Sequence, residues 1–194
     1  ELFNIIVEYI DETPVEEYAN SLLLKVLELI VENKDLLTNK DYEILFVTGN
    51  SSYDEINSNI GKSSNIKVVP YIKDMPEVLK FTDIIVSRAG ATTISEILSL
   101  GLVSILIPSP YVANNHQYLN ALSLKNNGAC ILMEEKDFDM EKLIKEIDTL
   151  LNNKEEYNKI SNPNDKRKVE LGILIQELSS EYENMIKTSG RGRR

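Results

Sequence analysis

The feature that most constrains the fold of this 194-residue chain is the alternation of short apolar runs with longer amphipathic stretches. The short runs are rich in Val and Ile, as parallel strands covered on both faces are, and the amphipathic stretches between them suit crossover helices. The runs are Asn4–Ile10, Glu43–Val47, Ile66–Val69, Asp83–Val86, Val103–Ile107 and Ala129–Met133. This order predicts an α/β chain with a Rossmann-like, doubly wound parallel sheet of about six strands.

The remaining stretches predict the helices and the domain limits. Helices are expected over Pro14–Glu32, Ser52–Ile60, Met75–Lys80, Thr92–Leu100, Asn114–Asn127, Met140–Leu151, Glu155–Ile160 and Asp165–Ile186. The breaker Ser161–Asn164 contains a proline and precedes the last of them. We therefore expect one domain over residues 1–161, a C-terminal helix over 162–187 that packs on this domain or on a partner, and a disordered basic tail over 188–194.

Composition excludes several classes of function. A net charge of −10 argues against a nucleic-acid surface, which needs clustered Lys and Arg. The single cysteine, Cys130, lies in an apolar run and is expected to be a buried small hydrophobe, and with one histidine the chain offers no metal constellation. No apolar run approaches the ~18 residues of a membrane helix, so we expect no direct membrane insertion. One cysteine fits a reducing, cytoplasmic compartment. Because the chain begins at Glu1 and not at Met, we expect a fragment, a processed chain or an engineered one.

The segment Asp83–Glu96 predicts an anion site. A strand runs into a small polar turn, Ser87–Ala91, and a helix then begins near Thr92 with a carboxylate, Glu96, about one turn in. Helix N–H groups and the positive end of the helix dipole would face an anion, and the carboxylate would accept hydrogen bonds from a sugar hydroxyl. The pattern indicates a phosphorylated sugar or a nucleotide.

Simpler interpretations of the same residues stay open from the sequence. Gly90 could serve a tight turn, Thr92 or Thr93 could cap the helix, and Glu96 could complement the helix dipole. His116 and Gln117 could be ordinary surface residues of a helix.

Five segments together resemble the C-terminal, donor-binding half of the MurG family. They are Phe46–Gly49, Pro70–Met75, Ser87–Glu96, Gly101–Pro108 and Asn115–Ala121. That family transfers N-acetylglucosamine from UDP-N-acetylglucosamine to an undecaprenyl-linked muramyl-peptide, and this half is the second Rossmann-like domain of a GT-B glycosyltransferase. The resemblance covers roughly Asn20 to Ile160.

The resemblance implies a role for each matching residue in binding UDP-N-acetylglucosamine or UDP. Ile72 would meet the uracil, Ala91, Thr92 and Thr93 the diphosphate, Glu96 the ribose, and His116 and Gln117 the N-acetylglucosamine, while Arg88 would order the loop or approach the phosphates. It implies no catalytic residue in this half, no metal and no cofactor, since the helix N-terminus would stabilise the departing UDP. It also implies a cytoplasmic protein whose parent family is peripheral on the inner face of the membrane.

The chain departs from the family in two places. The N-terminal half, which carries the acceptor site, is absent, so we expect donor binding without sugar transfer unless that half or a partner chain is supplied. Where the family has a glycine-rich loop after its first strand, this chain has the acidic segment Asp11–Glu17, in which Thr13 and Glu16 form a capping box. Each carboxylate ~4 Å from a phosphate costs about 1 kcal/mol in water and about 4 kcal/mol at an effective dielectric constant of 20.

These departures leave two origins open, a chimeric or engineered version of the donor domain and a naturally diverged donor subunit. They also leave two alternatives to a donor-binding domain that is inactive alone: a non-catalytic engineered or degenerate scaffold derived from it, and the donor subunit of a two-chain transferase. The segment Asn162–Arg194 also looks unlike the end of the family.

Overall fold

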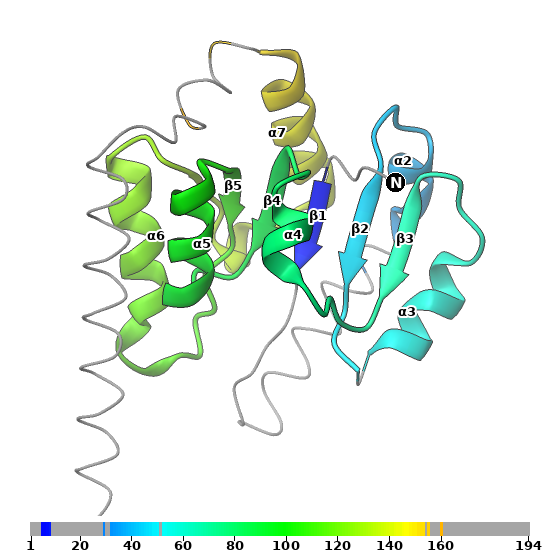
Figure 1. Ribbon diagram of the computed structural model, residues 1–194, viewed down its shortest axis with the longest axis horizontal. Helices are drawn as coiled ribbons and strands as arrows, with labels where there is room; N and C mark the ends of the chain where they lie inside the picture. Colours follow the sequence, from blue (N-terminus) through cyan, green and yellow to red (C-terminus); the bar gives the residue numbers. More distant parts are fainter. Residues whose placement is uncertain are drawn as a thin grey trace, which may run out of the picture.

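The chain folds around one six-stranded parallel sheet (Figure 1). The computed structural model describes residues 5–8, 29, 32–50, 52–153, 155 and 160. The strands are β1 (Ile5–Glu8), β2 (Ile44–Val47), β3 (Ile66–Val69), β4 (Ile84–Ser87), β5 (Val103–Leu106) and β6 (Ile131–Leu132). Their order is β3-β2-β1-β4-β5-β6, and every neighbouring pair is parallel. The predicted doubly wound sheet of six strands is confirmed.

The helices agree with the sequence pattern over the described part of the chain, with one addition. They are α2 (Lys34–Thr38), α3 (Tyr53–Ile60), α4 (Met75–Leu79), α5 (Ala91–Leu100), α6 (His116–Asn126) and α7 (Met140–Asn152), with the 3-10 turns η1 (Ala113–Asn115) and η2 (Glu135–Asp137). The short helix α2 was not predicted. Most of the residues of the helices expected over Pro14–Glu32 and Glu155–Ile160 lie outside the described part of the chain, as do residues 162–187 and 188–194. None of the helices in the described ranges is long and apolar enough to cross a membrane.

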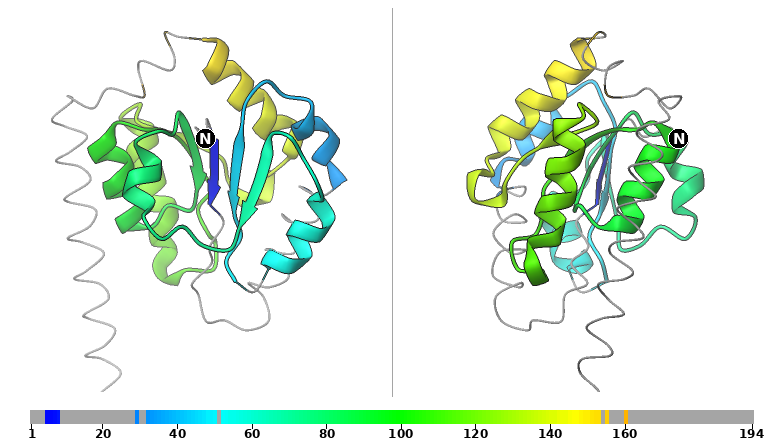
Figure 2. Two further views of the ribbon diagram at one scale, coloured as in Figure 1. Left: turned by 45° about the vertical axis from the view of Figure 1, so that its right-hand side comes forward. Right: turned by 90° about the vertical axis from the view of Figure 1, so that its left-hand side faces the viewer.

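Two helix layers cover the two faces of the sheet (Figure 2). Side chains of α2, α3 and α7 share one buried cluster, the α7-side core, and side chains of α4, α5 and α6 share another, the α5-side core. Strand β4 contributes side chains to both cores, because Ile84 and Val86 belong to the α7-side core and Ile85 to the α5-side core. All three side chains are at most 2% exposed. Strands buried on both faces carry no polar alternation, which explains the continuous apolar runs in the sequence.

The register places the predicted anion site at the point where strand order reverses. Strand β1 pairs with both β2 and β4, and its last residue, Glu8, lies opposite Ser87 at the end of β4. In doubly wound sheets, ligands bind beyond the carboxyl ends of the strands at this switch point. The turn that follows Ser87 therefore lies where such a fold binds its ligand.

Candidate functional site

The start of α5 offers backbone donors and no capping group. The helix begins at Ala91, and its N-cap is Gly90, which has no side chain with which to cap it. The first intrahelical bond runs from Ile94 N–H to the Gly90 carbonyl at 3.0 Å, so Thr92 and Thr93 lie inside the first turn. The reading of either threonine as the cap is wrong. The N–H groups of Ala91, Thr92 and Thr93 have no acceptor within the helix.

Neither the backbone nor the packing around Gly90 requires a glycine. Its φ of −69° and ψ of 148° suit any residue, so Gly90 ends the turn before α5 in a conformation that does not depend on glycine. A Cβ built on Gly90 would meet, among the described atoms, Thr93 Oγ1 at 3.9 Å, an ordinary contact. The missing side chain thus leaves room beside the first N–H groups of α5, as a phosphate requires.

Glu96 lies on the same face of α5 as the first-turn threonines. It is half-buried, and it stands four residues after Thr92 and three after Thr93, the spacings that bring helical side chains together. It is the sixth residue of the helix, beyond the first turn, which contains no acidic residue. Complementation of the helix dipole fades after the first turn and therefore does not account for Glu96.

Arg88 orders the turn between β4 and α5. The residue is 8% exposed, and its Nη1 donates to the Ile107 carbonyl at 3.0 Å and pairs with Glu135 Oε2 at 2.5 Å. These contacts join the ends of β4 and β5 to η2. Of the two roles expected for Arg88, the geometry supports ordering the loop.

Unusual backbone geometry precedes α6. Asn114 and Asn115 have φ values of 53° and 55°, the left-handed region that asparagine tolerates better than most residues do. Asn115 is also the N-cap, and its side chain makes no capping bond. As in α5, the first turn of α6 contains no acidic residue.

Side chains of α6 tie its start to the neighbouring turns. Gln117 Oε1 accepts from Ser109 N–H at 2.8 Å, and Asn120 Nδ2 donates to the Ala89 carbonyl at 3.2 Å. His116 and Gln117, both half-buried, therefore open a helix that is anchored to the β4–α5 turn.

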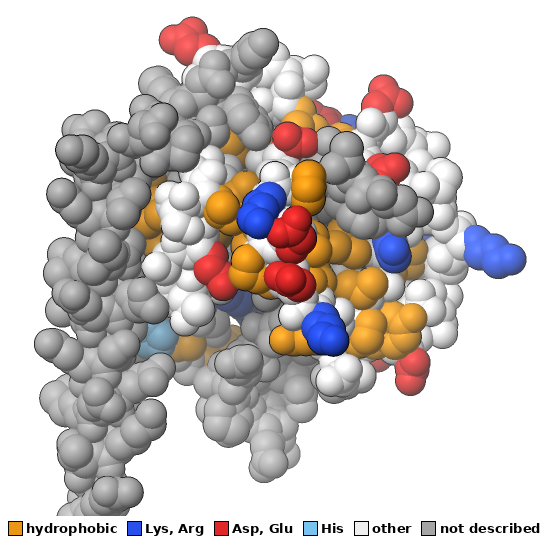
Figure 3. All heavy atoms as spheres, viewed as in Figure 1, with side chains coloured by type: hydrophobic (Ala, Val, Ile, Leu, Met, Phe, Trp, Pro, Cys, Tyr) orange, Lys and Arg blue, Asp and Glu red, His pale blue; other side chains and the backbone are white. Residues whose placement is uncertain are grey.

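Ile72 lies in the loop after β3 and packs into the α5-side core. Its side chain is 9% exposed and belongs to the same cluster as Ala89 and Ile94. With the side chain buried, the backbone of Ile72 is the part suited to meet a base. The neighbouring Tyr71 is 66% exposed and, with Phe81, borders a groove of about 270 Å³ on the face where Figure 3 shows apolar and charged side chains intermingled.

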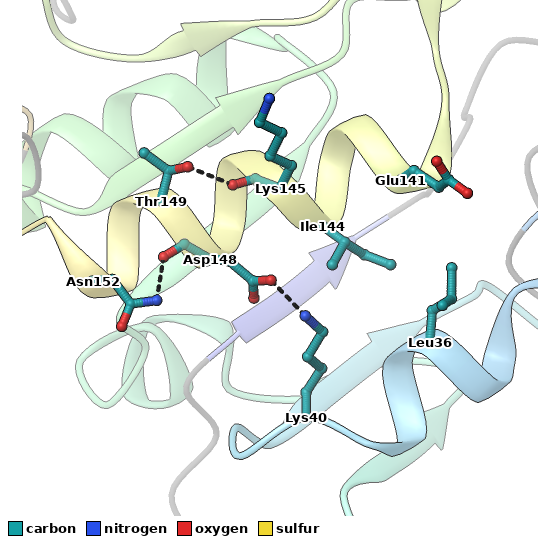
Figure 4. Close-up of a pocket in the computed structure, with 8 residues that line it drawn as sticks. All are labelled: Leu36, Lys40, Glu141, Ile144, Lys145, Asp148, Thr149 and Asn152. Atoms are coloured by element: carbon teal, nitrogen blue, oxygen red, sulfur yellow. Dashed lines mark hydrogen bonds and ion pairs between the residues drawn. The ribbon is translucent and has the colours of Figure 1, made fainter.

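A hollow of about 490 Å³ lies elsewhere, between α2 and α7 (Figure 4). Its floor includes Leu36 and Ile144, and an ion pair of 2.5 Å joins Lys40 Nζ to Asp148 Oδ2 beside it. The hollow contains none of the residues predicted for the donor site. Of its charged groups, Lys40 and Asp148 pair with each other, and we assign the hollow no chemistry.

Burial raises the pKa of the Cys130 thiol to about 12. Its Sγ is directed at the Ala121 carbonyl at 3.6 Å, so the thiol is a neutral, packed group. Within the described part of the chain, His, Cys, Asp and Glu side chains form no group of three or more that could hold a metal ion.

The structure thus distributes the predicted residues over loops and helix starts that follow three strands. Ile72 follows β3, Arg88 to Glu96 follow β4, and His116 and Gln117 follow β5. Sequence reasoning missed Asn120 and Glu135. Asn120 lies inside a segment that carries the family resemblance, whereas Glu135 is 47 residues from Arg88 and gave no signal in the sequence.

Comparisons with known proteins identify the family of this domain. The sequence profile of the glycosyltransferase family 28 C-terminal domain matches residues 22–173, past residue 162, where the family pattern was expected to end. UDP-N-acetylglucosamine–N-acetylmuramyl-(pentapeptide) pyrophosphoryl-undecaprenol N-acetylglucosamine transferase 1 of Bacillus cereus is 48% identical over 127 residues, which are 64% of this chain and 35% of that protein. The corresponding transferase of Bacillus subtilis is 41% identical over 135 residues, 68% of this chain and 37% of that protein. The aligned part spans about a third of these relatives.

Solved structures show the same fold. Acinetobacter baumannii MurG superimposes with a TM-score of 0.61 at 21% identity, covering 91% of this chain and 52% of that one. The glycotransferase of kitacinnamycin superimposes with a TM-score of 0.65 at 17% identity, covering 94% and 43% of the respective chains. On the profile match, this chain belongs to the glycosyltransferase family 28 C-terminal domain family.

Proposed function

We propose that this chain binds UDP-N-acetylglucosamine as the donor-binding half of a peptidoglycan glycosyltransferase. The observation that carries the proposal is the start of α5, where Gly90 leaves the first N–H groups uncapped at the switch point of the sheet. A helix N-terminus without a cap or an acidic residue favours an anion through its N–H groups and its dipole. The names of the Bacillus relatives indicate which anion, the diphosphate of UDP-N-acetylglucosamine.

Each remaining residue then has a chemical task. Glu96 would accept hydrogen bonds from the ribose hydroxyls, and a charged acceptor makes these bonds about twice as strong as neutral ones. The backbone of Ile72 would meet the uracil, and His116 and Gln117 would contact the sugar. As the bond from the anomeric carbon to the diphosphate oxygen breaks, negative charge grows on UDP, and the N–H groups of α5 are aimed at that charge.

Sugar transfer would need more than these residues. We propose that the acceptor and the group that activates it are supplied by the part of the relatives that this chain does not match, either within a longer protein or on a partner chain. By the same analogy the enzyme would work in the cytoplasm, at the inner face of the cell membrane.

Calorimetric titration with UDP-N-acetylglucosamine tests the binding proposal. We expect micromolar binding that is weakened roughly tenfold or more in Glu96→Ala. Binding should be kept in Glu146→Ala, a matched control because Glu146 is a half-buried helical carboxylate on α7, in the other helix layer. Binding that is absent, or millimolar and unaffected by Glu96→Ala, would contradict the proposal and favour the scaffold alternative.

A turnover assay tests the division of labour. The isolated chain should release no UDP in the presence of a lipid-linked acceptor. Measurable transfer by this chain alone would show that it does not need a second half.

A further inference from the structure

We propose that Glu135 is a positioning residue for donor binding, acting through Arg88. The Arg88–Glu135 pair would fix the turn Ala89–Gly90 in the conformation that presents the first N–H groups of α5. The inference rests on the proposed function, because those N–H groups matter only if a diphosphate binds there.

The contacts show how the pair could act at a distance from the ligand. Arg88 directly precedes the turn, and its Nη1 is held by the Ile107 carbonyl at 3.0 Å and by Glu135 Oε2 at 2.5 Å. The Ala89 carbonyl, one residue later, is held by Asn120 Nδ2 at 3.2 Å. Hydrogen bonds thus hold the turn at the Arg88 side chain and at the Ala89 carbonyl. Gly90, which has no side chain to pack, follows directly.

Burial explains why Arg88 would stay with Glu135 when a phosphate arrives. The side chains of Arg88 and Glu135 are 9% and 3% exposed, so moving the guanidinium toward a ligand would leave a buried carboxylate without its cation. An unpaired buried charge is strongly unfavourable, whereas the pair together is tolerated. The geometry therefore makes Arg88 a support of the turn Ala89–Gly90 and not a phosphate ligand.

The same loop provides a matched control. Glu134, the residue before Glu135, pairs with Lys136 at 2.9 Å, but those side chains are 36% and 71% exposed. Exposed pairs of this kind contribute little to stability. Glu134→Gln therefore removes a neighbouring carboxylate of the same loop without disturbing the buried pair.

The test combines a double-mutant cycle with amide chemical shifts. UDP affinity is measured by calorimetry for the wild type, Glu135→Gln, Arg88→Met, the double variant and Glu134→Gln, well below the thermal midpoint of each. We expect both single variants to weaken UDP binding by about tenfold, equivalent to about 1.4 kcal/mol. The double variant should be no weaker than either single variant, because both remove one support. In the ligand-free protein, the amide shifts of Gly90 and Ala91 should move in Glu135→Gln and stay in Glu134→Gln.

Other outcomes overturn the proposal in distinct ways. If Arg88→Met weakens binding while Glu135→Gln leaves it unchanged or tightens it, Arg88 is a phosphate ligand. If both variants lower only the thermal midpoint, the pair is purely structural. Should Arg88→Met fail to fold, Arg88→Lys replaces it, with the same weakening expected. If the wild type binds no UDP, the proposed function fails, and unmoved shifts of Gly90 and Ala91 in Glu135→Gln would reject the positioning role separately.

Discussion

Helices α4 and α7 begin differently from helices α5 and α6. In α4, Asp74 accepts from the Glu77 N–H at 3.3 Å, and in α7, Asp139 accepts from the Lys142 N–H at 2.9 Å. Each of these helices also carries an acidic residue in its first turn. Among the α-helices that the structure describes, α5 and α6 are the two with neither a side-chain cap nor an acidic first turn.

Under the proposed function, the difference separates helix starts that the protein satisfies itself from helix starts that a ligand would satisfy. A capping aspartate neutralises the exposed N–H groups and the positive end of the dipole, which stabilises the fold and closes the site to anions. The starts of α5 and α6, which lack both a cap and an acidic residue, follow β4 and β5, neighbouring strands beside the switch point. An anion bound there would replace the missing caps.

The largest effect should follow from removal of the carboxylate on the open helix. Glu96→Ala should weaken UDP binding by about 1.5–3 kcal/mol, the range for hydrogen bonds to charged groups. Stability should hardly change, because Glu96 is half-buried and lies outside the first turn. Calorimetry and a thermal melt measure the two quantities. An unaltered dissociation constant would mean that α5 does not face the ribose.

A second expected effect concerns the acidic segment Asp11–Glu17, which lies outside the described residues. If Asp11 and Glu12 face the phosphates, Asp11→Asn with Glu12→Gln should tighten UDP binding by roughly thirtyfold, at about 1 kcal/mol for each of the two carboxylates in water. The gain should shrink in 1 M salt, where the screening length is about 3 Å. No gain at low salt would show that this segment points away from the open helix starts.

On a capped helix, the expected effect is on stability alone. Asp139→Ala should lower the free energy of unfolding by about 1 kcal/mol, because the Lys142 N–H and the dipole of α7 lose their partner. UDP affinity should stay at the wild-type value. A denaturant titration measures the free energy of unfolding, and a UDP titration measures the affinity. A loss of UDP affinity in this variant would contradict the claim that capped helix starts serve stability alone.

The smallest effect on UDP affinity is expected at Cys130, which is buried against α6. The pKa of Cys130 is raised to about 12 by burial, so the folded protein keeps this proton when the unfolded chain loses it near pH 9. The thiol therefore contributes stability that is fully present below pH 9 and declines as the pH rises toward 12. A thiol reagent should label the folded protein slowly at pH 8, with UDP or without it. Rapid labelling would show that α6 is loosely packed.

The sequence was sufficient for the architecture because β2, β4 and β5 are buried along their whole length and appear in the sequence as mainly apolar runs. It was insufficient for the short helix α2, whose five residues include one buried side chain, Leu37, too few to create a period. It was also ambiguous about Gly90 and Thr92, since a glycine before two threonines fits a turn, a cap or a ligand site equally well. The helix boundary at Ala91 excludes the threonines as the cap, and the φ of Gly90 excludes a glycine-dependent conformation, whereas the ligand site stays a prediction.

Arg88 shows a different limit of sequence reasoning. Its position before the turn Ala89–Gly90 suggested two roles, ordering the loop or approaching the phosphates. The contact that favours the first role is with Glu135, which is distant in the sequence and follows β6. Pairings across parallel strands leave no local pattern. Such partners emerge only when the strand order is known.

One substitution tests the central claim most directly by giving α5 the cap that α4 and α7 already have. Gly90→Asp places a carboxylate at the N-cap, where the backbone is extended and a Cβ meets only an ordinary contact. We predict a free energy of unfolding that is unchanged or higher by a few tenths of a kcal/mol, because aspartate caps slightly better than glycine. UDP binding, measured by calorimetry, should be lost. A Gly90→Asp protein that is equally stable and binds UDP as the wild type does would show that the start of α5 is not the phosphate site.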